Sequence, residues 1–171
     1  LVQERLTEET RDQGSSLDKL TIEVVSIVFD YLYADKRLAE HVKTQLMRLQ
    51  VIAVKAALID RSFFARRDHP MRQLIDRMTE LASDPDFDFA EASPLMTGVT
   101  DIISWLLTSF EEDLGVFGEA MSRLEALVEQ AQTTRSEEIA DVTDEADRSD
   151  QLAQEKSKAH SELIYRCEES T

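Results

Sequence analysis

Residues 35–60 read DKRLAEHVKTQLMRLQVIAVKAALID, and this stretch decides the fold class. Apolar side chains recur in it every three or four residues, at Leu38, Val42, Leu46, Leu49, Ile52, Ala56 and Ile59. That spacing places them on one face of an α-helix. A second apolar face is added by Val51, Val54, Ala57 and Leu58. We therefore predict one helix from Asp35, its N-cap, to Ile59, with the second half buried on several sides.

The residues before this stretch predict another amphipathic helix, which ends near Ala34. Ser15 followed by Asp18 resembles a capping box, although Glu or Gln is the usual partner residue. Apolar side chains then recur at spacings of three and four: Leu17, Leu20, Val24, Ile27, Val28, Tyr31 and Leu32. The helix is expected to begin near Ser15 and to carry these residues as its apolar face.

Two dipeptides downstream predict where further helices begin. Residues 60–68 break the apolar pattern and form a connection, after which His69-Pro70 is expected to supply an N-cap and a first-turn proline. Ser93-Pro94 starts a second helix in the same way, after an acidic loop at 83–93. The inward residues of the two helices are Met71, Leu74, Ile75, Met78 and Leu81, then Leu95, Val99, Ile102, Ile103, Leu106, Leu107 and Phe110.

The last third of the chain opens with a seam of apolar residues at alternating spacings of three and four. Its members are Leu114, Phe117, Met121, Leu124, Val128 and Ala131. The seam is shorter than three heptads, so it suits either packing within the protein's own bundle or self-association as a short coiled coil. The residues that follow are polar and acidic, and their composition does not separate an exposed helix from a flexible segment.

These patterns predict an all-α fold, a bundle of about five to six helices with a long C-terminal helix. Stacked helix pairs of the HEAT or armadillo type remain one possible arrangement of the bundle. The expected domains are a helical bundle over 1–131 and an acidic exposed helix or flexible segment over 132–171. Because the chain begins at Leu1 rather than Met, we expect it to be part of a longer protein.

Composition narrows the class of protein further. Four glycines and three prolines are too few for the turns of a β-sandwich or a βαβ fold. No apolar run approaches the roughly 18–20 residues that a membrane span needs, and no signal-peptide pattern opens the chain. A single cysteine, Cys167, cannot form an internal disulfide bond, which suits a reducing compartment. The sequence therefore predicts a soluble, cytosolic protein that does not associate with membranes.

Charge is unevenly distributed along the chain. The net charge is −16, yet residues 36–78 hold ten Lys or Arg and only four Asp or Glu. Residues 79–171 hold six Lys or Arg and 23 Asp or Glu. The overall acidity argues against nucleic acid as a partner, because phosphates are repelled over a long range.

The motifs of common catalytic and cofactor sites do not occur in this sequence. Glycines at positions 14, 98, 115 and 118 cannot form a phosphate-binding loop. His41, His69 and His160 are isolated from one another and from Cys167, so no zinc ligand pair is expected. Asp84, Asp86 and Asp88 imitate the start of an EF-hand loop that lacks its glycine and its last glutamate. We expect no cofactor, no metal ion and no enzymatic activity.

One group of residues has the composition of a binding site. It surrounds Phe63 and Phe64 and consists of Arg61, Arg66, Arg67, His69, Arg72 and Arg77. Arginine forks bind carboxylates and phosphates through two hydrogen bonds, and a helix N-terminus adds a positive end. The arginine cluster therefore suits an anion or an acidic partner. It also suits a structural role, in which the arginines pair with the chain's own many carboxylates.

The run from Arg48 to Leu74 resembles a bacterial family, domain of unknown function 1631. Residues 55–74, KAALIDRSFFARRDHPMRQL, carry the family pattern K-x-A-L-x-D-x-S-F-F-x-R-x-x-H-P-x-R-x-L, and the similarity is best over residues 15–82. Ile52 stands where the family often has proline, so the helix is expected to run without a kink there. The resemblance implies a segment of a long proteobacterial protein. Some relatives are associated with PilZ modules, which bind cyclic di-GMP, but this sequence contains no PilZ motif.

Two hypotheses of function follow. The first is a non-catalytic helical scaffold or protein-interaction module of a bacterial regulatory protein. Its contact would be the arginine cluster or the Leu114–Ala131 seam, the latter giving a homodimer. The alternative is a sensing module that binds a small anion or a nucleotide second messenger, such as cyclic di-GMP, at the arginine cluster.

Overall fold

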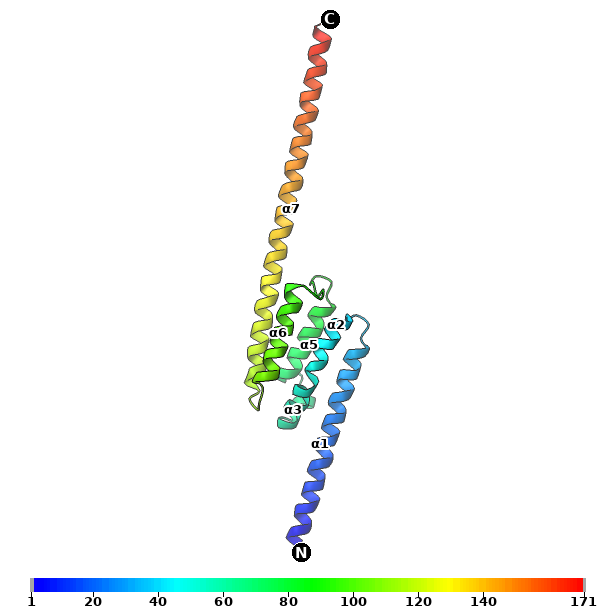
Figure 1. Cartoon of the computed structure of the whole chain (residues 1–171), viewed down its shortest axis with the longest axis vertical. Helices are drawn as coiled ribbons and strands as arrows, with labels where there is room; N and C mark the ends of the chain where they lie inside the picture. Colours follow the sequence, from blue (N-terminus) through cyan, green and yellow to red (C-terminus); the bar gives the residue numbers. More distant parts are fainter. Residues whose placement is uncertain (1, 171) are drawn as a thin grey trace. The chain divides into compact units, whose positions relative to one another are not determined.

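The computed structural model describes the backbone of residues 2–170 and the side chains of residues 13–170. Seven helices occur in this part of the chain, and it contains no strand, which confirms the all-α prediction (Figure 1). The helices are α1 (Val2–Ala34), α2 (Glu40–Arg48), α3 (Gln50–Ile59), α4 (Ser62–Ala65), α5 (Pro70–Ser83), α6 (Pro94–Ser109) and α7 (Gly115–Glu169). The long C-terminal helix was expected, and α4 is a single turn within the predicted connection.

The chain divides into two compact units, Leu1–Val128 and Glu129–Thr171. The division falls three residues before the predicted domain boundary at Ala131. It also falls inside α7, whose first part belongs to unit 1 and whose remainder makes up unit 2.

The first helix, α1, differs from the prediction in both its start and its buried face. It begins at Val2, so Ser15 and Asp18 lie inside the helix and form no capping box. The preceding residues are rich in Glu, Gln and Arg, which favour helix, and nothing there ends the helix. The side chains that it buries are Thr21, Val25 and Phe29. Most of the apolar residues that mark its predicted face are exposed instead.

The helix predicted from Asp35 to Ile59 is divided in two. α2 begins after Ala39, because residues 35–38 form a turn in which Asp35 accepts a hydrogen bond from the Arg37 backbone N–H at 2.9 Å. Leu49 separates α2 from α3, and its N–H donates to the Leu46 carbonyl rather than to the residue four before it. Ile52 in place of proline was expected to leave this helix unbroken, and that prediction is wrong because the helix breaks at Leu49. Leu49 itself is fully buried, as are Ala53, Ala56 and Ala57 of α3.

The helix starts at His69-Pro70 and Ser93-Pro94 are confirmed. The His69 Nδ1 atom accepts a hydrogen bond from the Met71 N–H at 3.3 Å, and Pro70 is the first residue of α5. The Ser93 hydroxyl accepts from the Met96 N–H at 3.1 Å, and Pro94 is the first residue of α6. The acidic loop between the two helices is held to α2 by His41, whose Nε2 lies 2.6 Å from the Phe89 carbonyl oxygen.

The core of unit 1 is completed by the packing of α7 on α6. The rings of Phe110 and Phe117 lie 4.9 Å apart at the start of α7, and the Arg123 guanidinium stacks on Trp105 at 3.8 Å. Gly98 allows the two helices to approach closely, because a Cβ atom there would lie 2.5 Å from Leu127 Cδ1. On the other side of the core, α1 packs against α2 and α3, and α2 packs against α6 (Figure 1).

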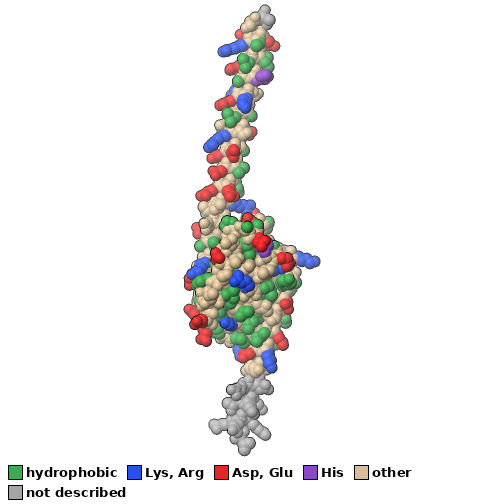
Figure 2. All heavy atoms as spheres, viewed as in Figure 1, with side chains coloured by type: hydrophobic (Ala, Val, Ile, Leu, Met, Phe, Trp, Pro, Cys, Tyr) green, Lys and Arg blue, Asp and Glu red, His purple; other side chains and the backbone are tan. Residues whose placement is uncertain are grey.

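Unit 2 is a single exposed helix. Every side chain described from Gln132 onward is exposed, including the apolar residues Ile139, Val142, Leu152 and Leu163. Figure 2 shows charged side chains along the whole of this helix, with hydrophobic ones scattered between them. Of the two alternatives for residues 132–158, the structure therefore has the helix.

Candidate functional site

The arginine cluster is largely paired with carboxylates of the same chain. Arg61 contacts Asp18 of α1, with 3.1 Å between Nη2 and Oδ1. Arg66 binds Asp68 through two hydrogen bonds of 3.0 and 2.7 Å. This ion pair raises the pKa of Arg66 and lowers the pKa of Asp68, chiefly through the side-chain hydrogen bonds. Two of the predicted anion-binding arginines thus already contact a carboxylate of the same chain.

Arg77 contacts two carboxylates, and one of them joins α5 to α7. Its guanidinium lies 2.7 and 3.2 Å from the two carboxylate oxygens of Glu125, and 3.2 Å from Glu80. The hydrogen bond to Glu125 is the main cause of the raised pKa of Arg77, and Arg77 likewise lowers the pKa of Glu125. Arg77 therefore ties together the helices of unit 1.

Arg67 and Arg72 are the remaining cations of the cluster. No ion pair joins either of them to a residue that the structure describes. Arg67 is exposed and Arg72 is half-buried, and they lie on either side of the α5 start. Two cations are a smaller charge than the sequence predicted for this site.

His69 is part of the core and is not available to a ligand on the surface. Its side chain is only 1% exposed, and its ring packs on Phe63 with centroids 5.1 Å apart. Because Nδ1 accepts a hydrogen bond, Nε2 carries the proton of the neutral ring, and it lies 3.7 Å from Asp60 Oδ2. Burial lowers the pKa of His69, which keeps the ring neutral.

The seam at the start of α7 is occupied by the protein's own core. Phe117 and Leu124 are fully buried and Val128 nearly so, while Leu114, Met121 and Ala131 are half-buried. A face that contacts α6 in this way leaves little for a second copy. The structure favours the first of the two alternatives, packing within the bundle.

A third surface was missed by the sequence reasoning, and it lies on α1. Six apolar side chains face outward there, and we name them the α1 stripe: Leu17, Leu20, Val24, Ile27, Val28 and Tyr31. Ile27 is 65% exposed and Tyr31 is 82% exposed, whereas Val24 is half-buried. The sequence contained the signal, because apolar residues cover more of α1 than one buried face requires.

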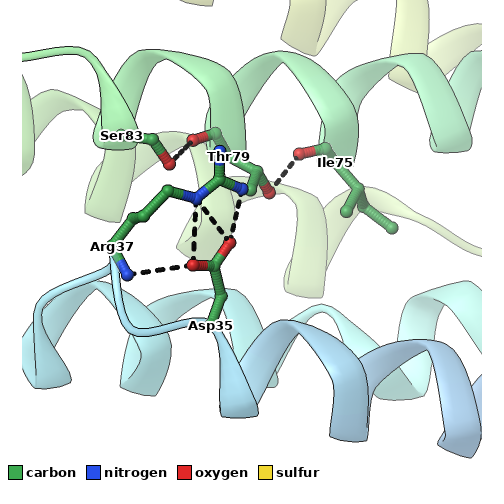
Figure 3. A network of polar contacts seen from close by, with 5 residues as sticks. All are labelled: Asp35, Arg37, Ile75, Thr79 and Ser83. Carbon is green, nitrogen blue, oxygen red and sulfur yellow. Dashed lines mark hydrogen bonds and ion pairs between the residues drawn. The ribbon is translucent and has the colours of Figure 1, made fainter.

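A hollow lies beside the C-terminal end of the α1 stripe. It has a volume of about 440 Å³, and Leu32 lines it together with Arg37 and five residues of or next to α5: Asp76, Thr79, Glu80, Ser83 and Asp84. Figure 3 shows Arg37 reaching from the connection after α1 toward Thr79 and Ser83. The Arg37 guanidinium is held by Asp35 at 2.6 Å, and this contact lowers the pKa of Asp35 to about 2. Because Glu80 is paired with Arg77, the carboxylates of Asp76 and Asp84 are left as the main charge of the hollow.

Two other kinds of site are absent from the part of the chain that the structure describes. No group of three or more His, Cys, Asp or Glu side chains is placed there to hold a metal ion. No described helix is long and apolar enough to span a membrane.

The family described as "Protein of unknown function (DUF1631) 2nd domain" matches residues 1–113. No curated protein and no solved structure matches the chain. The matched residues include the run 55–74 that suggested this family, and they make up most of unit 1. The chain therefore belongs to the DUF1631 family and contains the second domain of that family.

Proposed function

We propose that this chain is a non-catalytic helical module that binds another protein through the α1 stripe. The observation that supports the proposal is the exposure of the stripe, in which Leu20, Ile27 and Tyr31 are each more than half exposed. A row of large apolar side chains at spacings of three and four is the usual contact face between helices. Isolated apolar residues on a surface are common, but a continuous row indicates a partner.

The arginine cluster is a weaker candidate for the contact. Arg61, Arg66 and Arg77 are paired internally, and His69 is buried, so an anionic ligand would have to compete with Asp18, Asp68 and Glu125. This arrangement weighs against the sensing of a nucleotide second messenger. The proposal retains the cytosolic setting that the single cysteine favours.

A comparative pull-down tests the proposal. The wild-type chain and a Leu20→Glu/Ile27→Glu variant are immobilised, and proteins captured from a lysate of the source organism are identified by mass spectrometry. Both substituted residues are exposed, so the variant should keep its helical circular dichroism and its unfolding temperature. We expect a partner that the wild type captures and the variant does not.

Two further variants locate the contact. Ile139→Glu/Val142→Glu places the same charges on exposed residues of unit 2 and should capture the partner normally. Arg66→Glu/Arg67→Glu/Arg72→Glu tests the arginine cluster. Loss of the partner only in the arginine variant would move the contact to that cluster. Identical captures by all four proteins would contradict the proposed function.

A further inference from the structure

The charges around the α1 stripe indicate what kind of partner it takes. Resting on the proposed function, we infer that the stripe binds a basic amphipathic helix, about four turns long, from a partner protein. The inference depends on the length and spacing of the stripe, on the acidic groups along both of its edges, and on the exposure of Tyr31.

The dimensions of the stripe suit a helix. Leu17, Leu20, Val24, Ile27 and Tyr31 follow one another at alternating spacings of three and four, which makes a seam of two heptads that Val28 flanks. At 1.5 Å per residue the seam is about 21 Å long, and a partner helix of about 14 residues would cover it. Leu17, Leu20 and Ile27 would then insert between the apolar residues of that helix.

One edge of the stripe is acidic because of α1 itself. Glu23 and Asp30 are both exposed, and they lie four residues before and three residues after Ile27. Side chains at those distances are neighbours on a helix surface. Residues 17–31, which span the stripe, contain three carboxylates and one cation, Lys19. Lys19 lies four residues before Glu23 on this edge, so Glu23 and Asp30 together leave the edge with an excess of one negative charge.

The other edge is acidic because of α5. Val28 lies one helical turn before Leu32, so the stripe adjoins the hollow that Leu32 lines. The carboxylates of Asp76, Glu80 and Asp84 line the same hollow, and Glu80 is paired with Arg77. Arg37, its one cation, is bound to Asp35. A partner helix on the stripe would therefore meet carboxylates on both sides.

This charge pattern selects among the possible occupants. A second copy of the chain packed antiparallel, stripe against stripe, would bring Glu23 and Asp30 close to the same residues of its partner, and like charges repel. An anionic membrane surface would be repelled in the same way. Lys or Arg flanking the apolar face of a partner helix would instead be attracted to both edges. Tyr31, which is 82% exposed, offers its ring face to such a cation.

Synthetic helices test the inference on the full 171-residue chain. The probe is a 21-residue peptide with Leu and Ile at the two seam positions of each heptad and Lys at the flanking positions. Its matched control has Glu in place of every Lys, and a second control scrambles the basic sequence so that it has no apolar face. Binding is measured by fluorescence anisotropy at low and at physiological salt concentration.

We expect the basic amphipathic peptide to bind at least about tenfold more tightly than either control, with an affinity that falls as salt rises. Leu20→Glu/Ile27→Glu should abolish this binding, and Ile139→Glu/Val142→Glu should leave it unchanged. Glu23→Lys/Asp30→Lys keeps the apolar residues of the stripe. It should weaken binding of the basic peptide and strengthen binding of the acidic peptide. Equal binding of the two peptides, or no binding of either, would overturn the inference.

The two experiments can fail separately. One outcome is that the stripe variant loses a partner in the pull-down while the basic peptide does not bind. The stripe is then a contact surface for a partner that is not basic, and the inference of a basic helix fails while the proposed function stands. If light scattering shows a dimer that the stripe variant loses, the occupant is a second copy, which also overturns it.

Discussion

Two rows of apolar residues with the same spacing differ in burial: the one on α7 is buried and the one on α1 is exposed. The seam on α7 buries Phe117 and Leu124 completely, whereas the α1 stripe leaves Leu20 55% exposed and Ile27 65% exposed. Both stripes alternate at three and four residues over about two heptads. The difference lies in what each helix meets. The α7 seam meets Phe110, which follows α6, and the space that Gly98 leaves on α6. α1 instead packs on the bundle through another set of residues, Thr21, Val25 and Phe29.

The comparison shows that apolar periodicity identifies a face and not its partner. α1 is apolar over two adjacent sectors, one used by the bundle and one facing outward. A helix that served only its own bundle would need the first sector alone. The second sector is therefore the part of α1 that folding does not explain.

The largest expected effect is a difference in the free energy of unfolding between variants of the α7 seam and of the α1 stripe. Leu124→Ala should lower the free energy of unfolding by about 2–5 kcal/mol, because it removes a fully buried side chain and leaves a cavity. Leu20→Ala, the same change on the exposed stripe, should alter it by less than about 0.5 kcal/mol. Urea unfolding followed by circular dichroism measures both values. Equal losses would mean that the α1 stripe is covered within the protein, and the comparison would fail.

A smaller loss of stability is expected on acidification, and it should come from His69 in the core. His69 caps α5 through Nδ1 and its pKa is lowered from 6.5 by burial. A lowered pKa in the folded state means that the unfolded chain binds the proton more readily, so stability is full above pH 6.5 and falls below it. Protonation would also turn Nδ1 into a donor facing the Met71 N–H, at a cost near that of a lost N-cap, about 0.5–2 kcal/mol.

Thermal unfolding between pH 7.5 and 5.5 tests this expectation. His69→Asn retains a side-chain acceptor for the Met71 N–H but does not titrate in that range, so its midpoint should stay nearly constant while that of the wild type falls. A parallel fall in both proteins would assign the effect to other groups. The carboxylates with lowered pKa values, such as Asp68 and Glu125, lose their contribution only at lower pH.

The smallest expected effect is a change in stability when glycines of α6 and α7 are replaced by alanine. Gly118→Ala should stabilise the protein by about 0.5–1 kcal/mol, since a Cβ atom there meets nothing within 4 Å and alanine favours helix. Gly98→Ala should gain less or destabilise slightly, because its Cβ atom would displace the Leu127 side chain. Differential scanning calorimetry of the two variants compares them. An equal gain at both positions would show that α6 and α7 approach less closely than described.

The parts of the fold that could be predicted depend on local chemistry. His69-Pro70 and Ser93-Pro94 start helices because a side-chain acceptor and a proline suit the first turn wherever it occurs. No glycine or proline predicts the break at Leu49, and buried residues lie on both sides of it. Ser15 resembled a cap, yet a cap is needed only where a helix begins.

The candidate site was harder to predict because its determinants are distant in the sequence. The arginine cluster was predicted from residue types alone, but Arg61 pairs with Asp18, 43 residues away, and Arg77 pairs with Glu125, 48 residues away. The residues of the α1 stripe were recognised as apolar and assigned to a buried face. Which sector of α1 meets the bundle depends on α2 and α3, and one helix's own pattern does not contain that information.

The first part of α7 also has a consequence for any transfer of this domain to another protein. Similarity to the DUF1631 second domain ends at residue 113, whereas the side chains that close the core continue to Val128. A recombination event that cut the gene at the end of the similarity would separate Phe117, Ala120 and Leu124 from the helices they cover. The family match is thus shorter than the compact unit, and a fusion or swap that keeps this core intact has to be joined after Val128.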